Sequence, residues 1–513
     1  MQIERTKNTT RNMLWGLIEK LLQLVLPFVT RTLILKLIGE QYLGLNSLFT
    51  SIISVLNLAD LGFGAAITFS MYKPIADNDE HKLCALLGYY KTIYRVIGGI
   101  VLGVGIAIMP FLKHLITGEV PNDINLYLLY SIYLLNTVLS YWLFAYKKSL
   151  IHAYHRDDVS TKISVSLLIL QYGLQIGLLF LFDNYYLYIL ILPIITLFNN
   201  ILTAIVAKKM FPSLICRGKV DEITRKDIKR RVGGAFIGKF CGVTRNSLDS
   251  IFISSFFGLT LVAIYGNYYY ILTAVHGLLT IVTVAMAGGV GNSIAKESVE
   301  KNYQDFENFT FLYSWISGWF ACCLLCLYQP FMQIWVGEDL MFSSSIMILF
   351  PIYLYVMAAS DIKNVYYTAC GLWWEGRWRA ALEFGLNLIL NYFGAKYLGV
   401  VGIMLATIIT MIGVNFIYGT QILFKYYFSK QKLSKCFLQH LLYLVVTFLM
   451  AISTYFICAL LPKSGILYFF LKGIICIFLP NLFYFLVYFK TGIFRRATTL
   501  FKNLISIVIK KRF

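Results

Sequence analysis

The sequence has little charge and lacks several motifs that would point to soluble enzymes. Asp, Glu, Lys and Arg make up 14% of the 513 residues, whereas an ordinary soluble domain has roughly 25%. No glycine-rich loop ending in Lys-Ser or Lys-Thr is present, so the chain shows no nucleotide-binding motif of its own. The first apolar stretch carries Glu19, Lys20, Arg31 and Lys36, which is not the pattern of a cleavable signal peptide. These absences exclude a soluble domain and an ATP-driven motor within the chain.

Hydrophobic residues, in contrast, form 58% of the sequence, and the mean hydropathy is +0.70. They recur in runs of about 20 residues, the length of a helix that crosses a bilayer. The pattern predicts an all-α, polytopic membrane protein of about 14 transmembrane helices. The predicted spans begin near residues 13, 43, 83, 125, 163, 186, 232, 261, 308, 344, 379, 399, 436 and 466.

The distribution of the 45 Lys and Arg residues predicts the orientation of these spans. If the N-terminus is cytoplasmic, most of them lie in cytoplasmic segments, and only Lys113, Lys396 and Lys463 lie outside. Cytoplasmic loops of membrane proteins carry such an excess. We therefore predict a multi-pass protein of the cytoplasmic membrane with both termini inside, and no nucleic-acid partner in spite of the formal charge of +20.

The order of spans and charged segments predicts the organisation of the chain. Two six-helix bundles would be joined by a basic cytoplasmic linker and followed by two further helices and a basic amphipathic tail on the anionic inner leaflet. Because six is even, both bundles would start from the cytoplasm with the same topology. The predicted parts are residues 1–207, 208–231, 232–425, 436–489 and 490–513.

Charged residues inside the predicted spans are the candidates for function. Each costs roughly 2.5 to 3.5 kcal/mol in the centre of a bilayer even on a lenient scale, so these side chains must face a wet interior. Lys36, Lys472 and Glu383 lie near span ends, where we expect them to reach the interface. Lys20, Lys363 and Glu19 also fall within the spans. The residues we select as candidates for the site are the basic residues Arg31, Lys91, Arg95, Lys239 and Arg245 and the acidic residues Asp60, Asp249 and Asp361.

The spacing of these residues places some of them on one helix face. Arg245 and Asp249 are four residues apart, so a structural ion bridge within one helix is an equally good interpretation. Lys91 and Arg95 have the same spacing but like charge, so they repel unless an anion lies between them. Asp60 from another span is one candidate for that anion. The basic excess of the interior predicts an anionic cargo, most plausibly phosphate.

The cysteines and histidines give weaker signals. Cys322, Cys323 and Cys326 share one predicted span without a nearby His or carboxylate, so we interpret them as small apolar residues. His152 and His155 lie in a basic cytoplasmic loop, where a solvated face is the better interpretation. We expect no metal, no cofactor and no catalytic residue.

Several segments, covering the first twelve spans in order, resemble one known family. They are "GEQYLGLNSLFTSIISVLNLADLGFGAAITFSMYKPIADND" (Gly39 to Asp79), "LLNTVLSYWLFAYKKSLIHA" (Leu134 to Ala153), "GGVGNSIAKES" (Gly288 to Ser298), "PFMQIWVGED" (Pro330 to Asp339) and "YTACGLWWEGRWRAALEFGLNLIL" (Tyr367 to Leu390). The chain resembles the polysaccharide transporter family, the Wzx-type oligosaccharide-lipid flippases of the multidrug/oligosaccharidyl-lipid/polysaccharide exporter superfamily.

The resemblance implies a fold like that of the drug antiporters and the lipid II flippase, and a cargo of oligosaccharide on undecaprenyl diphosphate. By this resemblance the protein is a transporter and not an enzyme, and its cargo would be used for a surface polysaccharide of the capsule or O-antigen type. Transport would proceed by alternating access, with the five basic residues binding the diphosphate. Asp60, Asp249 and Asp361 would compensate the charge of the basic residues or couple transport to H⁺ or Na⁺. Further partners would be membrane lipid and a polysaccharide polymerase.

Three alternatives remain open. A multidrug antiporter of the same superfamily would carry cations, which the positive interior disfavours. A membrane polysaccharide polymerase, ligase or glycosyltransferase would need a sizeable external loop, whereas the longest predicted external segments, 113–124 and 332–343, are short. A structural scaffold would have no use for charges inside its spans.

Overall fold

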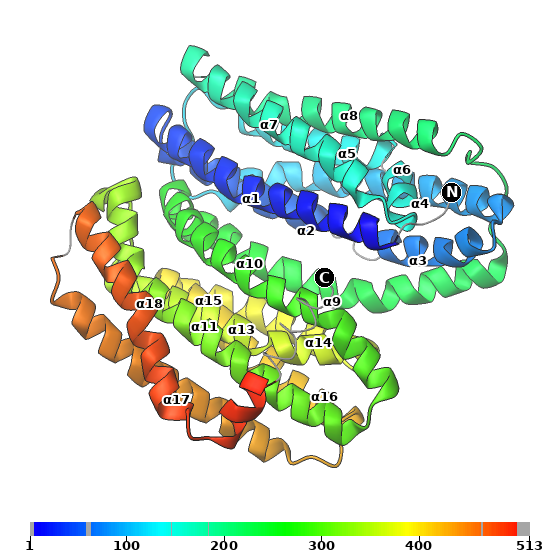
Figure 1. Ribbon diagram of the computed structural model, residues 1–513. Coiled ribbons are helices and arrows are strands. Elements are labelled where there is room, and N and C mark those ends of the chain that lie inside the picture. Colours follow the sequence, from blue (N-terminus) through cyan, green and yellow to red (C-terminus); the bar gives the residue numbers. More distant parts are fainter. Residues whose placement is uncertain (1–4, 58–62, 145, 183, 463–464, 500–513) are drawn as a thin grey trace. The chain divides into compact units, whose positions relative to one another are not determined.

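The computed structural model describes residues 5–57, 63–144, 146–182, 184–462 and 465–499. Every regular element in these ranges is helical (Figure 1). The predicted all-α fold is therefore confirmed.

The helices follow one another through short connections. Those of the first half are α1 (Arg5–Leu37), α2 (Glu40–Leu56), α3 (Phe63–Ala76), α4 (Glu80–Ile108), η2 (Met109–Leu115), α5 (Leu126–Trp142), α6 (Tyr146–Ala153), α7 (Asp157–Phe182), α8 (Tyr185–Met210) and α9 (Glu222–Phe257). Those of the second half are α10 (Leu259–Lys296), α11 (Val299–Val336), η3 (Glu338–Leu340), α12 (Ser344–Met347), α13 (Leu349–Ala359), α14 (Asp361–Ala369), α15 (Arg377–Thr410), η4 (Met411–Tyr418), α16 (Gly419–Tyr426), α17 (Leu433–Ala459) and α18 (Ile466–Tyr488).

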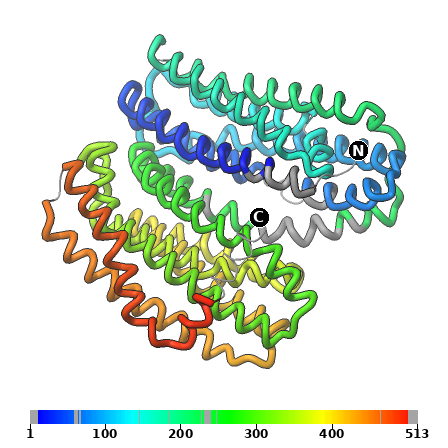
Figure 2. The backbone as a smooth tube through the Cα atoms, viewed as in Figure 1, coloured from blue at the N-terminus to red at the C-terminus, as the bar shows by residue number. Residues whose placement is uncertain are grey.

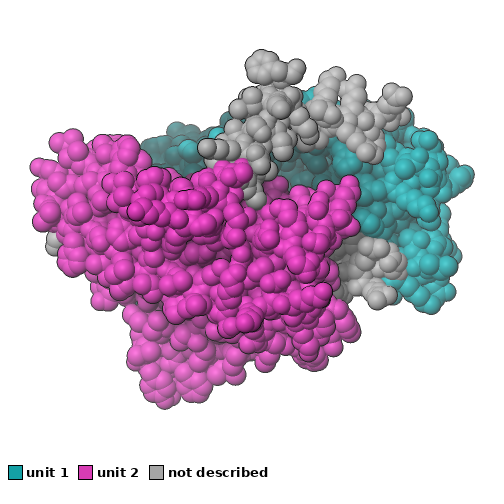
Figure 3. All heavy atoms as spheres, turned by 60° about the horizontal axis from the view of Figure 1, so that its bottom comes forward, with its two compact units in different colours: residues 1–263 teal, residues 264–513 magenta. Residues whose placement is uncertain are grey.

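The chain divides into two compact units, which Figure 3 colours separately. Unit 1 comprises residues 1–263 and unit 2 residues 264–513. Helix α9 packs against α2, α3 and η2 and so groups with unit 1. By contact, α9 thus belongs to the N-terminal unit, whereas the predicted order places it at the start of the second six-helix bundle. The division into two six-helix bundles stays a prediction about topology.

Nine helices of the described residues are long and apolar enough to cross a membrane, and the bent pair α5 and α6 would add a tenth. One of the nine runs for 50 residues, Arg377–Tyr426. A straight helix of that length would extend for about 75 Å, more than twice the thickness of the hydrocarbon core. The run is interrupted at Gly399, whose φ of 66° and ψ of −146° are not helical. Two of the predicted spans, near residues 379 and 399, meet at this turn.

The two halves of α15 form a tight helical hairpin around Gly399. A Cβ atom on Gly394 would overlap the backbone of Gly402, and one on Gly402 would overlap the backbone of Gly394. Further along the hairpin, the Asn387 side chain donates a hydrogen bond to the Thr407 hydroxyl at 3.0 Å. Glycine at these two positions allows the backbones to touch, as small residues do between membrane helices.

Within unit 1, α7 packs against α1 and α8, while α5 packs against α4 and α8 (Figure 2). The core between them is apolar and includes Leu48, Phe49, Leu86, Tyr130 and Ile189, all nearly inaccessible to solvent. Two bulky residues of α5 fit against glycines of α4, because a Cβ atom at Gly98 or Gly105 would overlap Trp142 or Leu134. The antiparallel helices of unit 1 are thus held by ordinary side-chain packing.

A buried carboxylate connects α1 with α7 at the end of unit 1 where α7 begins. Asp158 is fully buried and contacts three basic side chains: Arg156 Nε at 2.9 Å, Arg11 Nη2 at 3.1 Å and Lys162 Nζ at 3.9 Å. Its backbone N–H also donates to Asn12 Oδ1 at 2.7 Å. Because Arg11 and Asn12 belong to α1, this cluster, named here the Asp158 cluster, fixes the start of α7 against that helix.

Unit 2 is built around α11, which contacts α13, α14, α17 and α18. Phe311, Cys322, Met450 and Tyr484 belong to one buried cluster that joins α11 to the two C-terminal helices. The two helices that follow the twelfth predicted span therefore share the hydrophobic core of unit 2. Residues 492–499 form a further helical segment, and Arg496 Nη2 lies 3.6 Å from Glu307 of α11. The rest of the predicted tail lies outside the described residues.

Polar caps mark where several helices begin. Asn125 accepts backbone hydrogen bonds at the start of α5, Asn184 at the start of α8 and Ser298 at the start of α11. Asp221 accepts from the Thr224 backbone N–H and hydroxyl, both at 2.8 Å, which lowers the pKa of this carboxyl group at the start of α9. Each cap satisfies N–H groups that a helix end leaves without an intrahelical partner.

Candidate transport site

Asp361 lies inside unit 2, in contact with side chains from two other helices. It is the first residue of α14, directly after the break at Ser360 that separates α13 from α14. Its Oδ2 atom accepts a hydrogen bond from the Tyr313 hydroxyl of α11 at 2.6 Å and lies 3.0 Å from Nε2 of His276 of α10. All three belong to helices that cross the membrane by length and composition. Ionisable side chains that meet inside membrane helices mark a candidate functional site.

A second group of ionisable side chains lies close to Asp361 in sequence. Lys363, two residues further along α14, is 2% exposed. Its ammonium group donates to the backbone oxygen of Asn415 and to Asn415 Oδ1 at 2.9 Å. The Asn415 amide in turn donates to both carboxylate oxygens of Glu383 at 3.3 Å, and Glu383 lies 3.7 Å from Arg379 Nη1. The chain Lys363, Asn415, Glu383 and Arg379 thus links α14, η4 and α15 by charge-assisted bonds.

The backbone of η4 makes room for this chain. Residues Met411–Tyr418 form a π-helix, whose wider turn changes the usual pairing of backbone carbonyls. The carbonyl of Asn415 accepts from Lys363 here. At the next element, a Cβ atom on Gly419 would lie 2.6 Å from Lys363 Nζ. The lysine thus meets its acceptor within the π-helix and lies close to the backbone of Gly419.

The burial of Glu383 corrects one expectation from the sequence. Glu383 and Lys472 were expected at the membrane interface because they lie near span ends, yet each is 5% exposed. Glu383 is held inside by Asn415 and Arg379, so packing against neighbouring helices overrides the distance from the helix end. Lys36, the third of these residues, is exposed.

The predicted basic residues of unit 1 lie on three helices. Arg31 of α1 is half-buried and within electrostatic reach of Tyr185 and Tyr188 of α8. Lys91 is half-buried and Arg95 exposed, one turn apart on α4. In the described part of the chain, no carboxylate lies within ion-pair distance of Lys91 or Arg95. Lys91 and Arg95 therefore lie one turn apart, as predicted from their spacing, and no carboxylate of the described residues lies between them.

Arg245 and Asp249 are both buried on α9, one turn apart, and neither is without a partner. The side chain of Lys239 and the whole of Asp60 lie outside the described residues. Unit 1 thus holds the described basic candidates and Asp249, while unit 2 holds Asp361. The contacts of Asp361 with His276 and Tyr313 were not predicted. One signal in the sequence could have indicated them, namely His276 as a single histidine in an apolar span. Ionisable residues in membrane helices are usually functional.

Three cysteine thiols also meet inside unit 2. The sulfur atoms of Cys326, Cys458 and Cys476, from α11, α17 and α18, all lie within 4.8 Å of one another. Zinc sites normally have four ligands, and over the described ranges no histidine or carboxylate completes this group. Cys322, Cys323 and Cys326 are neighbours on one helix, whereas the thiols that meet come from three helices. We assign them a packing role.

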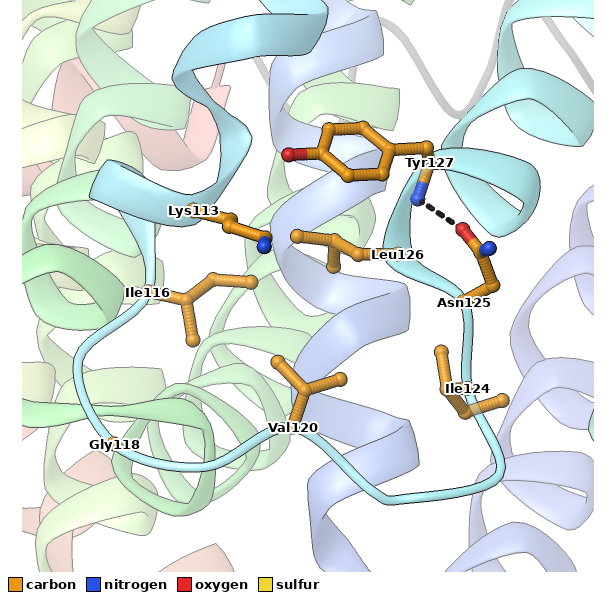
Figure 4. Close-up of a pocket in the computed structure, with 8 residues that line it drawn as sticks. All are labelled: Lys113, Ile116, Gly118, Val120, Ile124, Asn125, Leu126 and Tyr127. Atoms are coloured by element: carbon orange, nitrogen blue, oxygen red, sulfur yellow. Dashed lines mark hydrogen bonds between the residues drawn. The ribbon is translucent and has the colours of Figure 1, made fainter.

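A hollow of about 430 Å³ lies at the surface where η2 is connected to α5 (Figure 4). Lys113, Val120 and Leu126 point into it, and Asn125 Oδ1 accepts from the Tyr127 backbone N–H at 3.1 Å. Lys113 is the only charged residue of its lining. The hollow is formed mainly by a connecting loop and lacks the converging charges of the groups described above, so we do not include it in the transport site.

Comparisons with known proteins identify the fold. No protein-family model matches the sequence, and no curated protein matches it. Among solved structures, 27 chains match. One is the lipid II flippase MurJ in an inward closed conformation, with a TM-score of 0.66 and 15% identity over 93% of this chain and 98% of that chain.

Two further structures have the same fold over most of the chain. An inward-facing multidrug resistance MATE family transporter of the MOP superfamily has a TM-score of 0.58 and 14% identity, covering 80% of this chain and 94% of that chain. A MOP superfamily transporter from Pyrococcus furiosus, described as having a binding pocket of reverse polarity, gives 0.54 and 14%, with coverages of 82% and 96%. The chain therefore has the polytopic membrane fold of these transporters.

Proposed function

We propose that this chain is a flippase that moves oligosaccharide units on undecaprenyl diphosphate across the cytoplasmic membrane of a bacterium. Alternating access would carry the sugars and the diphosphate through the protein while the polyprenyl chain stays in lipid. The product would supply a polysaccharide polymerase that assembles a capsule or an O-antigen. Both termini would lie in the cytoplasm.

The observation that carries this proposal is the pair Lys91 and Arg95. Arg95 lies 15 residues after Glu80, the first residue of α4, which corresponds to about 22 Å along the helix. An exposed arginine at that depth costs roughly 2.5 to 3.5 kcal/mol if it faces lipid. Facing a wet cavity removes this cost, and an anion between the two cations removes their repulsion. A diphosphate has the charge and the oxygen atoms that arginine and lysine bind.

The fold supports a lipid-linked cargo. The MurJ structure, that of a lipid II flippase, covers 93% of this chain, whereas the MATE transporter covers 80%. For the Pyrococcus furiosus protein, a reversed polarity of the binding pocket was taken to suggest a different function. The charge of the interior can therefore distinguish between cargoes within this fold. A positive interior favours an anionic lipid over a cationic drug.

We also infer that Asp361 and His276 couple transport to an ion. Protonation of the pair would change the charge beside Tyr313 and Lys363, and through Lys363 the contacts of α14 with η4 and α15. An H⁺ fits an imidazole and carboxylate pair better than Na⁺, which prefers oxygen ligands. Asp60 and Asp249 would compensate the basic residues of unit 1 when no diphosphate is bound.

Deletion of the gene tests the function directly. Lipid-linked repeat units should accumulate at the inner leaflet, and surface polysaccharide should be lost. Complementation of the deletion strain with Arg95→Gln should restore little polysaccharide, and Arg245→Lys should restore more of it than Arg245→Gln. The control Arg217→Gln, at an exposed residue outside the spans, should restore all of it. Protein levels are compared by immunoblot.

Unchanged polysaccharide with Arg95→Gln at normal protein levels would remove the diphosphate role of that residue. Accumulated repeat units at the outer leaflet would instead indicate a polymerase or ligase. Increased sensitivity to cationic drugs without a change in polysaccharide would indicate a multidrug antiporter.

A further inference from the structure

A polar cavity without charged residues lies inside unit 1. It is open on one side, has a volume of about 310 Å³, and is lined by residues of α2, α5, α7 and α8 and by Asn57, which directly follows α2. Five amide side chains line it: Asn46, Asn57, Asn136, Gln171 and Gln175. The remaining lining consists of hydroxyl groups, tyrosine rings and a few aliphatic side chains. A cavity with this lining inside a membrane helix bundle calls for a ligand or for water, because amides in hydrocarbon are costly without partners.

The three asparagines use their oxygen atoms within the protein. Asn46 Oδ1 accepts from Tyr133 at 2.8 Å, Asn57 Oδ1 accepts from the Tyr141 hydroxyl at 3.2 Å, and Asn136 Oδ1 accepts from Thr196 at 2.7 Å. These bonds fix the orientation of each amide. None of the three Nδ2 groups donates to another residue of the described part. The lining thus supplies three oriented N–H donor groups from α2 and α5.

The opposite side of the cavity supplies an acceptor and aromatic surface. Gln175 Nε2 donates to the Tyr188 backbone oxygen at 3.1 Å, and Gln171 Nε2 donates to Gln175 Oε1 at 3.4 Å. Gln171 Oε1 accepts no hydrogen bond from another described residue, and Gln171 lines the cavity together with Tyr172 and Tyr188. Hydrogen-bond donors, an acceptor and ring faces without charge match the hydroxyl groups and the C–H faces of a sugar ring.

The size and depth of the cavity agree with such a ligand. Ligand pockets range from about 300 to 1,000 Å³, so this one accommodates a single ring, or about ten water molecules. Gln175 lies seven residues before the end of α7 and Asn136 ten residues after the start of α5, about 10 and 15 Å from those helix ends. Inorganic phosphate would lack a cation here, and a metal ion would lack a carboxylate.

Tyr188 connects the cavity with a predicted diphosphate ligand. Its ring lines the cavity, and its hydroxyl lies within electrostatic reach of Arg31 of α1. The charge of Arg31 makes it a candidate phosphate ligand independently of these amides.

We propose that this cavity binds one uncharged pyranose ring of the cargo's headgroup. The inference rests on the proposed function, because it assigns part of the same cargo to unit 1. The asparagine amides donate to ring hydroxyl groups, and a tyrosine ring contacts the apolar face of the sugar. Sugar selectivity would then be determined in this cavity, while the charged residues recognise the diphosphate common to all such carriers.

The test uses the purified full-length protein in nanodiscs and a panel of methyl glycosides of neutral hexoses, deoxyhexoses and N-acetylhexosamines. Binding is measured by saturation-transfer difference NMR. Asn136→Leu removes one donor of the cavity and its bond to Thr196 of α8. Asn200→Leu is the matched control, because Asn200 donates to the Leu139 oxygen across the same pair of helices at 3.3 Å but does not line the cavity.

We expect saturable binding of at least one glycoside to the wild type and to Asn200→Leu. Binding to Asn136→Leu should be about two- to tenfold weaker, the effect of one neutral hydrogen bond, and Asn46→Leu should act in the same direction. Absence of saturable binding, equal binding to Asn136→Leu, or binding of inorganic phosphate that Asn136→Leu abolishes would overturn the inference. The deletion strain tests the flippase function separately, so each hypothesis can fail without the other.

Discussion

The Asp158 cluster allows a stability prediction with a matched control. Breaking a buried ion pair by removing one partner costs about 3 to 5 kcal/mol. Arg11 and Arg156, which Asp158→Asn would leave behind, are 39% and 18% exposed, so water partly solvates them and lowers the cost to about 2 to 3 kcal/mol. A unit of 263 residues should then lose about 4 to 6 °C in Tm, at roughly 2 °C per kcal/mol.

Thermal unfolding can be followed with a thiol-reactive dye, because the protein has ten free cysteines, most of them buried. The control is Asp157→Asn, which changes the adjacent carboxylate at the same helix end. Asp157 is 35% exposed and lies 2.6 Å from His152, so its loss should cost less than about 1 kcal/mol. Equal Tm shifts for the two variants, or no shift for Asp158→Asn, would refute the assignment of the cluster as the link between α1 and α7.

Two pairs of variants test the packing and the charges of unit 2. Gly402→Ala should lower the Tm, because its Cβ atom would overlap the backbone of Gly394. The control Gly385→Ala, at an open position of the same helix, should leave the Tm unchanged or raise it, because alanine has the higher helix propensity. Equal Tm shifts for the two variants would contradict the tight hairpin. Asp361→Asn should abolish the dependence of lipid-linked sugar transport on a pH gradient in proteoliposomes, while Tyr313→Phe, which removes one hydrogen bond, should slow transport up to about tenfold and keep that dependence. A retained gradient dependence in Asp361→Asn would exclude this residue from coupling.

Apolar runs made the membrane helices predictable from the sequence. The fourteen predicted starts all fall within a described helix or at the residue before one. The pair of starts near 379 and 399 was informative, because one continuous helix would have been far too long for a bilayer. The turn itself, at Gly399, depends on a single backbone conformation. Glycine permits that conformation, but a glycine in the sequence does not by itself predict it.

Long-range contacts limited prediction of the site. Asp361 was selected for its charge, but its contact with His276 joins residues 85 positions apart, and no local pattern encodes such a pairing. Glu383 was expected at the interface because position along a helix was the only information available. Its burial depends on Asn415, whose backbone is shaped by the π-helix. The cavity of unit 1 could not be predicted, because uncharged amides in apolar spans form no local pattern that marks a ligand site.

The hairpin at Gly399 has a consequence for how the protein enters the membrane. Its first helix carries Glu383 and Asn387 and would be poorly accepted by lipid alone. The second helix, which follows without a loop, brings Thr407 and Asn415 to these side chains. The two helices are therefore expected to leave the translocon as one insertion unit, with their polar groups already paired. Segment swaps or reporter fusions between residues 394 and 402 should then impair biogenesis before they affect transport.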